Sequence, residues 1–138
     1  MSSSPDKPAE GPLLLDTHAL LWWLAEPKRL SNRAHAAIAS PSRQVFVSAA
    51  SGWELATKVR LGKLAFPEQL LAELGDVLKA QGFELLAIQF RHGLQAGAYP
   101  QAHRDPFDRL LAAQAELEQL TLVSLDPALT AFPCQLLW

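Results

Sequence analysis

The chain has 138 residues, of which 49% are hydrophobic and 19% charged, which indicates one globular domain rather than a disordered segment. Its net charge of −2 argues against broad electrostatic binding of nucleic acid, but not against a site that meets phosphate through metal ions. The single cysteine, Cys134, excludes an intrachain disulfide and a cysteine-built zinc site. No apolar run reaches the length of a membrane span and no basic leader precedes residues 13–24, so we expect a cytoplasmic protein with no membrane association.

Short apolar runs alternate with helical patterns along the chain. Residues 1–11 are rich in serine, proline and charge, which predicts a mobile tail, and residues 12–138 are expected to form the domain. Strands are predicted at residues 12–15, 45–47, 83–87, 121–125 and 134–137, and helices at 17–25, 31–40, 49–61, 67–80, 89–98 and 106–120. This alternation predicts an α/β fold with a short, mainly parallel sheet flanked by helices.

The helix predicted from Pro106 begins with two carboxylates three residues apart. Pro106 suits the first helical position, because its missing N–H would have no partner there. Asp105 is placed to cap the helix, and Asp108 falls near its third position, at the positive end of the helix dipole. An ordinary acidic helix start explains this stretch equally well when it is taken alone.

Acidic residues follow the predicted strands at equivalent points of the topology. Asp16 follows the first strand, Glu54 lies in the helix after the second, Asp108 opens the helix before the fourth, and Asp126 follows that strand. The carboxyl ends of parallel strands share one rim, so these side chains are expected to converge there. Converging carboxylates raise each other's pKa or bind a cation, and Mg²⁺ and Mn²⁺ prefer oxygen ligands. Each residue alone is also explained as a strand-end or capping carboxylate.

Four segments of the chain carry recognisable motifs: 13–22 (LLLDTHALLW), 47–58 (VSAASGWELATK), 103–112 (HRDPFDRLLA) and 122–126 (LVSLD). Together they resemble the PIN domain, and in particular the VapC-type toxins of bacterial toxin–antitoxin pairs. The resemblance implies a PIN fold and an endoribonuclease toxin, dependent on Mg²⁺ or Mn²⁺, that hydrolyses RNA phosphodiester bonds. It also implies a cognate antitoxin and a homodimer. The acidic cluster it implies is Asp16, Glu54, Asp108 and Asp126, with Asp105 as a cap or an outer ligand.

The expected mechanism is metal-assisted hydrolysis, in which Asp16 and Asp108 hold the principal ion and Glu54 and Asp126 complete the cluster. Arg104 and Arg109 are the best candidates for phosphate contacts. Lys58, Arg60 and Lys63 follow Glu54, but solvated helix faces and a Glu54–Lys58 pair explain them as well. His18 and His103 lie near the rim, where a structural hydrogen bond is favoured over metal ligation.

Other functions were weighed against the same residues. A haloacid-dehalogenase-like phosphatase needs a second aspartate two residues after the first, where this chain has His18. No glycine-rich phosphate loop or Gly-x-Ser-x-Gly elbow is present. Two alternatives stay open: a catalytically silent PIN-like binding module, and a PIN nuclease outside toxin–antitoxin systems.

If Trp22 or Trp23 is exposed, the apolar helices between residues 19 and 78 are expected to form the groove that binds an antitoxin helix.

Overall fold

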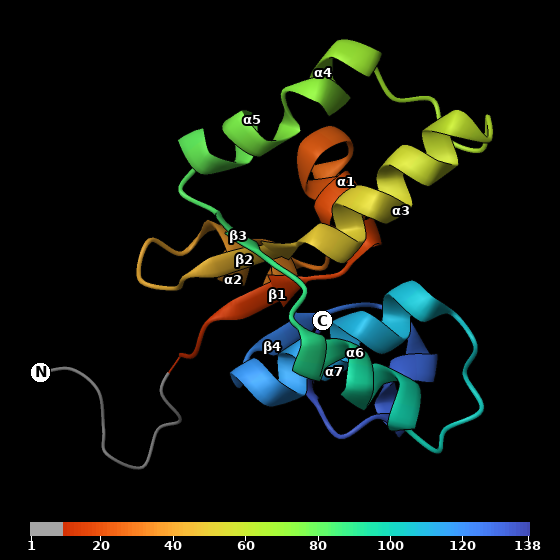
Figure 1. Cartoon of the computed structure of the whole chain (residues 1–138). Helices are drawn as coiled ribbons and strands as arrows, with labels where there is room; N and C mark the ends of the chain where they lie inside the picture. Colours follow the sequence, from red (N-terminus) through yellow and green to blue (C-terminus); the bar gives the residue numbers. More distant parts are fainter. Residues whose placement is uncertain (1–9) are drawn as a thin grey trace, which may run out of the picture.

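Five parallel strands form the centre of the computed structural model, which describes residues 10–138 (Figure 1). The sheet has the order β3-β2-β1-β4-β5. The strands are β1 (Leu13–Leu15), β2 (Val45–Ser48), β3 (Glu84–Leu86), β4 (Thr121–Val123) and β5 (Gln135–Leu137). All four pairings between neighbouring strands are parallel, which confirms the predicted α/β fold.

The central strand β1 explains why the sheet is covered on both faces. Leu13, Leu14 and Leu15 are all fully buried. Side chains alternate along a strand, so Leu13 and Leu15 pack in one apolar cluster and Leu14 in the other. Leu15 lies opposite Val47 of β2 and Val123 of β4. This register brings the carboxyl ends of the three middle strands to one edge of the sheet.

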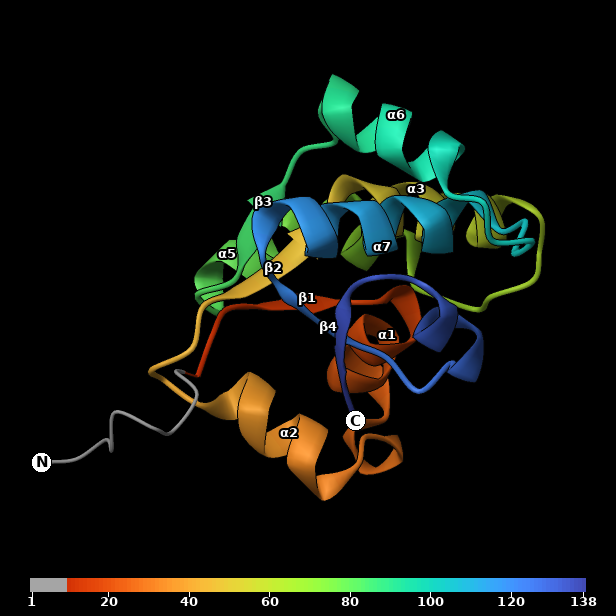
Figure 2. The ribbon, with the colours of Figure 1, turned by 90° about the horizontal axis from the view of Figure 1, so that it is seen from below.

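The helices form a layer on each face of the sheet. They are α1 (Thr17–Ala25), α2 (Asn32–Ala39), α3 (Ala49–Arg60), α4 (Glu68–Ala72), α5 (Leu74–Ala80), α6 (Phe90–Ala98) and α7 (Pro106–Glu118). Residues of α1, α2 and α5 pack with Leu13 and Leu15, whereas α6 and α7 pack with Leu14 on the opposite face (Figures 1 and 2). Helix α3 contributes to both layers, Leu55 to the first and Ala50 to the second.

The structure differs from the predicted elements at three places. The single helix expected over residues 67–80 is two helices, because the backbone at Glu73 leaves the helical region with φ −99° and ψ 4°. The break directs Leu74 and Leu78 of α5 into the core. Two short 3₁₀ helices, η1 (Pro27–Arg29) and η2 (Pro127–Ala131), were not predicted. Each begins with proline, whose fixed φ suits the first helical position.

The amino-terminal end of the described chain is tied to the domain. Most of the expected tail, residues 1–9, lies outside the described residues. Gly11 belongs to no helix or strand, yet its carbonyl accepts a hydrogen bond of 2.9 Å from Nε of Arg43. Within residues 10–138, no helix combines the length and the apolar character needed to cross a membrane.

Candidate metal centre

Asp16 is built into the junction between β1 and α1. Its backbone N–H donates to the carbonyl of Val123 (3.1 Å), which extends the pairing with β4, and its Oδ1 accepts from the amide of Ala19 (2.7 Å) and caps α1. The side chain is buried, and this burial raises the pKa of Asp16. The Ser124 side chain and the Ala19 amide oppose the rise by hydrogen bonding, and the negative charge of Glu54 adds to it. Asp16 is therefore a carboxylate whose charge is incompletely compensated.

Glu54 lies close enough to Asp16 for their charges to interact, and it has its own counter-charge. Its side chain is buried, and Oε2 lies 2.9 Å from Nζ of Lys58, one helical turn further along α3. The Thr17 hydroxyl donates to Oγ of Ser51 (3.1 Å) and links the start of α1 to α3. Thr17 and Ser51 therefore bind each other in the wall of the site.

Asp105 and Asp108 have different roles at the start of α7. Oδ1 of Asp105 accepts from the amides of Phe107 (2.8 Å) and Asp108 (3.1 Å) and caps the helix. Oδ2 of Asp108 lies 2.8 Å from Nε2 of His103. Burial raises the pKa of Asp108 to about 6, with further contributions from the charges of Asp105 and Asp126, while the hydrogen bond to His103 opposes the rise.

A compact group of possible ligands forms around Asp108. One ligand atom each of His103, Asp108 and Asp126 lies within 4.8 Å of the other two. Asp126 reaches the group from the end of β4, where its Oδ1 also accepts from the amide of Ala128 (2.9 Å) and caps η2. Among residues 10–138, Asp16 and Glu54 are not members of this group, although they occupy the same rim of the sheet. The predicted acids thus gather in two neighbouring sets.

The sequence did not show that His103 lies next to both Asp108 and Asp126. The expected structural hydrogen bond is present, since the ring bonds to Asp108. The same nitrogen stands among the possible ligand atoms, so the histidine both orients the carboxylate and belongs to the site. Its position five residues before Asp108, across the helix cap, was the available signal.

The donor set fits a divalent cation. Carboxylate oxygens suit Mg²⁺ and Mn²⁺, and an imidazole nitrogen is acceptable to transition metals. The raised pKa values of Asp16 and Asp108 show that the fold leaves both carboxylates short of positive charge, which a bound cation would supply.

Arg109 was predicted to contact phosphate, but in the structure its guanidinium is engaged within the protein. Its guanidinium donates to four backbone carbonyls, one near the end of α6, Ala96 (2.8 Å), and three in the loop between α6 and α7, Tyr99 (2.6 Å), Gln101 (2.9 Å) and His103 (2.7 Å). These bonds engage every guanidinium nitrogen and fix the loop that carries His103. Arg109 is therefore a structural residue. Of the other predicted basic residues, Lys58 is paired with Glu54, while Arg104 is exposed beside His103.

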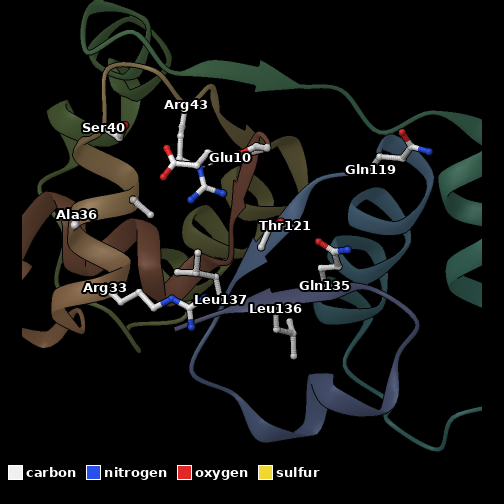
Figure 3. A pocket seen from close by; sticks show the side chains of 12 residues that line it. Glu10, Arg33, Ala36, Ser40, Arg43, Gln119, Thr121, Gln135, Leu136 and Leu137 are labelled. Atoms are coloured by element: carbon white, nitrogen blue, oxygen red, sulfur yellow. Dashed lines mark hydrogen bonds between the residues drawn. The ribbon is translucent and has the colours of Figure 1, made fainter. Parts of the chain in front are cut away.

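A separate cavity of about 650 Å³ lies at the opposite, amino-terminal ends of the strands (Figure 3). Gly11 precedes β1, Arg43 precedes β2, Thr121 begins β4 and Gln135 begins β5, and all four line it. Among the described residues that line it, Glu10 is the only one with a carboxylate. The carboxylate pattern of the metal centre is not repeated there.

Comparison with known proteins agrees with this architecture. The model of the PIN domain family matches residues 13–133. The chain is 33% identical over 115 residues to a protein of Mycobacterium tuberculosis named ribonuclease VapC22, covering 83% of this chain and 86% of that one.

Solved structures share the fold at low sequence identity. VapBC2 from Rickettsia felis, bound to a DNA fragment from its promoter, superposes with a TM-score of 0.68 at 17% identity and covers 91% of this chain and 98% of the other. FitAcB from Neisseria gonorrhoeae gives 0.64 at 20% identity, covering 91% and 96%. A toxin–antitoxin complex from Klebsiella pneumoniae gives 0.62 at 16% identity, covering 91% and 96%. With its five parallel strands, its acidic rim and a family match over nearly its whole length, the chain belongs to the PIN-domain family.

Proposed function

We propose that this protein is a divalent-metal-dependent endoribonuclease that acts as the toxin of a toxin–antitoxin pair. The observation that carries the proposal is the convergence of His103, Asp108 and Asp126 at the same rim of the sheet as Asp16 and Glu54. The relative named ribonuclease VapC22 supports the reaction, and the fold shared with VapBC2 supports the biological setting. We propose the cytoplasm as the location of this activity, because a nuclease of this kind must reach cellular RNA.

Some residues of the rim are proposed as ligands of the ion, and others position those ligands. Asp16 and Asp108 hold the principal Mg²⁺ or Mn²⁺, and Glu54 and Asp126 complete the cluster. When bound, the ion supplies an activated water and neutralises charge on the phosphate. His103 fixes the rotamer of Asp108, Lys58 fixes that of Glu54, and Asp105 holds the helix start from which Asp108 projects.

RNA positioning falls to Arg104, because it is the exposed arginine next to the cluster. Lys58 is already paired with Glu54, so its contribution to phosphate binding is secondary. A single surface arginine adds modest affinity, and its loss is expected to weaken binding of all RNA sequences alike.

An antitoxin is the proposed protein partner, and an apolar groove supports it. The groove, of about 490 Å³, lies between α3, α5 and β3 and is lined mainly by aliphatic side chains, including Leu71, Leu74, Leu78 and Leu85. Amphipathic helices bind grooves of this kind. Trp22 and Trp23 are half-buried, and neither is among the residues that line the groove. The indole N–H of Trp23 donates to Gln81 instead (2.8 Å). The homodimer implied by the family is proposed on the family alone.

Cleavage of RNA by the purified protein tests the reaction. We expect cleavage with Mn²⁺ or Mg²⁺, no cleavage in excess chelator, and loss of activity in Asp16→Asn and Asp108→Asn variants that stay folded. Asp76→Asn, which alters an exposed acid of α5, is the matched control and should cleave like the wild type. Full activity of Asp108→Asn, or activity in chelator, would refute the assignment. A catalytically silent module would show neither cleavage nor thermal stabilisation by Mn²⁺.

A further inference from the structure

Trp53 is a large aromatic side chain exposed beside the metal centre. It is 55% exposed, whereas Trp22, Trp23 and Trp138 are half-buried. The ring of Phe107, from the start of α7, lies 4.6 Å away between centroids and at 74° to the indole. In this edge-to-face arrangement Phe107 can cover at most one face of the indole. Phe107 therefore leaves at least one face of the indole uncovered, and the exposure of Trp53 shows that solvent reaches the ring.

The aromatic pair is tied to the acids through the backbone. Trp53 directly precedes Glu54 on α3, and Phe107 directly precedes Asp108 on α7, so each ring starts about 3.8 Å along the chain from a residue of the cluster. The amide of Phe107 donates to the same Asp105 oxygen that holds the amide of Asp108. The position of the pair is therefore fixed by the same cap that positions Asp108, where α3 and α7 lie side by side (Figure 2).

The charges of the site favour an additional, uncharged contact to RNA. The chain carries a net charge of −2, the guanidinium of Arg109 is engaged by backbone carbonyls, and Lys58 is paired with Glu54. Attraction between phosphates and basic side chains, the usual source of affinity for nucleic acid, is therefore weak here. An exposed indole gives affinity of another kind, because unpaired bases stack on aromatic rings.

We propose that Trp53, held in place by Phe107, is a stacking platform for an unpaired base of the RNA that binds at the metal centre. This inference rests on the proposed ribonuclease function and adds a residue that positions the substrate. A base within a duplex is stacked on its neighbours and cannot stack on the indole. The platform therefore selects single-stranded segments, such as loops, over duplex RNA. The stacked base takes no part in breaking the bond, so stacking supports the ground state and the transition state equally and acts on KM rather than on kcat.

Two variants of Trp53 and one matched control test the platform. Trp53→Ala removes the ring, Trp53→Phe keeps an aromatic face, and Phe90→Ala removes an exposed aromatic (83% exposed) from the first residue of α6. Phe90 lies at the far end of α7 from Asp108, since the neighbouring Arg91 forms an ion pair with Glu118. Affinity is measured with a mixed-sequence RNA of about 12 nucleotides, single-stranded or annealed to its complement. Binding is measured with and without Mn²⁺ in both the wild-type and the Asp108→Asn backgrounds, and the wild-type background also gives kcat and KM.

We expect Trp53→Ala to weaken binding of the single strand by about 5- to 150-fold, the equivalent of 1–3 kcal/mol for one stacked base. KM should rise by a similar factor with kcat unchanged, Trp53→Phe should stay within about threefold of the wild type, and Phe90→Ala should change nothing. Affinity for the duplex should not depend on Trp53.

Unchanged binding of the single strand by Trp53→Ala, or an equal loss for single strand and duplex, would overturn the platform. So would a variant that binds RNA normally but has lost its affinity for the antitoxin chain, since the indole would then be a protein contact. If Trp53→Ala alters neither binding nor KM while metal-dependent cleavage persists, the platform fails and the ribonuclease stands. If the wild type does not cleave but its binding of single-stranded RNA depends on Trp53, the ribonuclease fails and the platform stands.

Discussion

Replacing Asp108 with Asn should stabilise the metal-free protein while it abolishes the response to metal. Burial raises the pKa of this carboxyl from 3.8 to about 6. The folded state therefore holds the proton more tightly than the unfolded state, and stability falls as pH rises through the interval between these two values. A shift of this size corresponds to about 3 kcal/mol at neutral pH, where Asp108 is ionised in both states. Asparagine carries no charge and avoids this cost.

The assay compares thermal unfolding of the wild type and the variant in chelator at two pH values. At about pH 7.5 the variant should be more stable by up to about 3 kcal/mol, which raises the Tm by up to about 10 °C at roughly 3 °C per kcal/mol for a chain of this length. At about pH 4 the wild-type carboxyl is protonated in the folded state and most of the difference should vanish. Added Mn²⁺ should raise the Tm of the wild type and leave the variant unchanged.

Two results would refute the reasoning. A variant less stable than the wild type at neutral pH would mean that the carboxylate is a net stabilising group, held by His103 more strongly than burial penalises it. A variant that keeps its Mn²⁺-dependent rise in Tm would show that the ion binds elsewhere. Asp76→Asn is the control and should shift stability by no more than about 0.5 kcal/mol at either pH.

Substitutions at two further positions, Arg109 and Asp105, separate structural roles from functional ones at the start of α7. Arg109→Met should lower the free energy of unfolding in urea by about 3–5 kcal/mol, because four carbonyls lose a charged donor, and Arg109→Lys should not restore it, because an ammonium lacks the planar fork. Reduced RNA affinity of an Arg109 variant at unchanged stability would instead indicate that Arg109 contacts phosphate. Asp105→Ala should cost about 0.5–2 kcal/mol as a lost cap, and Asp105→Asn should recover most of that. Neither Asp105 variant should alter the Tm rise with Mn²⁺, and a lost response in Asp105→Asn would make Asp105 a ligand.

Local patterns in the sequence predicted the elements of the fold well where burial and capping act on the same few residues. Leu13–Leu15 reads as a buried strand because all three residues are apolar, and the structure buries all three. Ser31 stands at the start of the helix predicted over residues 31–40, and it caps that helix by accepting from the amide of Ala34 (3.0 Å). The break at Glu73 has only a weak signal, since no proline lies beside it and Gly75 falls inside α5 rather than at the break. It follows from the packing of Leu74 and Leu78, which only the assembled fold determines.

The sequence predicted which strand ends and helix starts carry the site residues, but it did not predict which side chains contact one another. The rule that parallel strands end at one rim placed Asp16 and Asp126 correctly at adjacent strand ends. Where Arg109 points is decided by the path of the loop between α6 and α7, whose carbonyls converge on its guanidinium. Sequence spacing cannot show such a convergence, so an arginine beside a cluster of acids was assigned to phosphate. The contact between His103 and Asp108 depends on the same loop.

The acids of the rim differ in how completely the fold compensates their charge, and this difference ranks them as ligands. Glu54 has a full counter-charge in Lys58 at 2.9 Å. Asp16 and Asp108 are buried with raised pKa values and are supported by hydrogen bonds that offset only part of the cost of burial. A cation gains most where negative charge is least compensated. Neutralising Asp16 or Asp108 should therefore reduce metal affinity far more than neutralising Glu54, whose removal would leave Lys58 as a new positive charge at the site and weaken the ion mainly by repulsion.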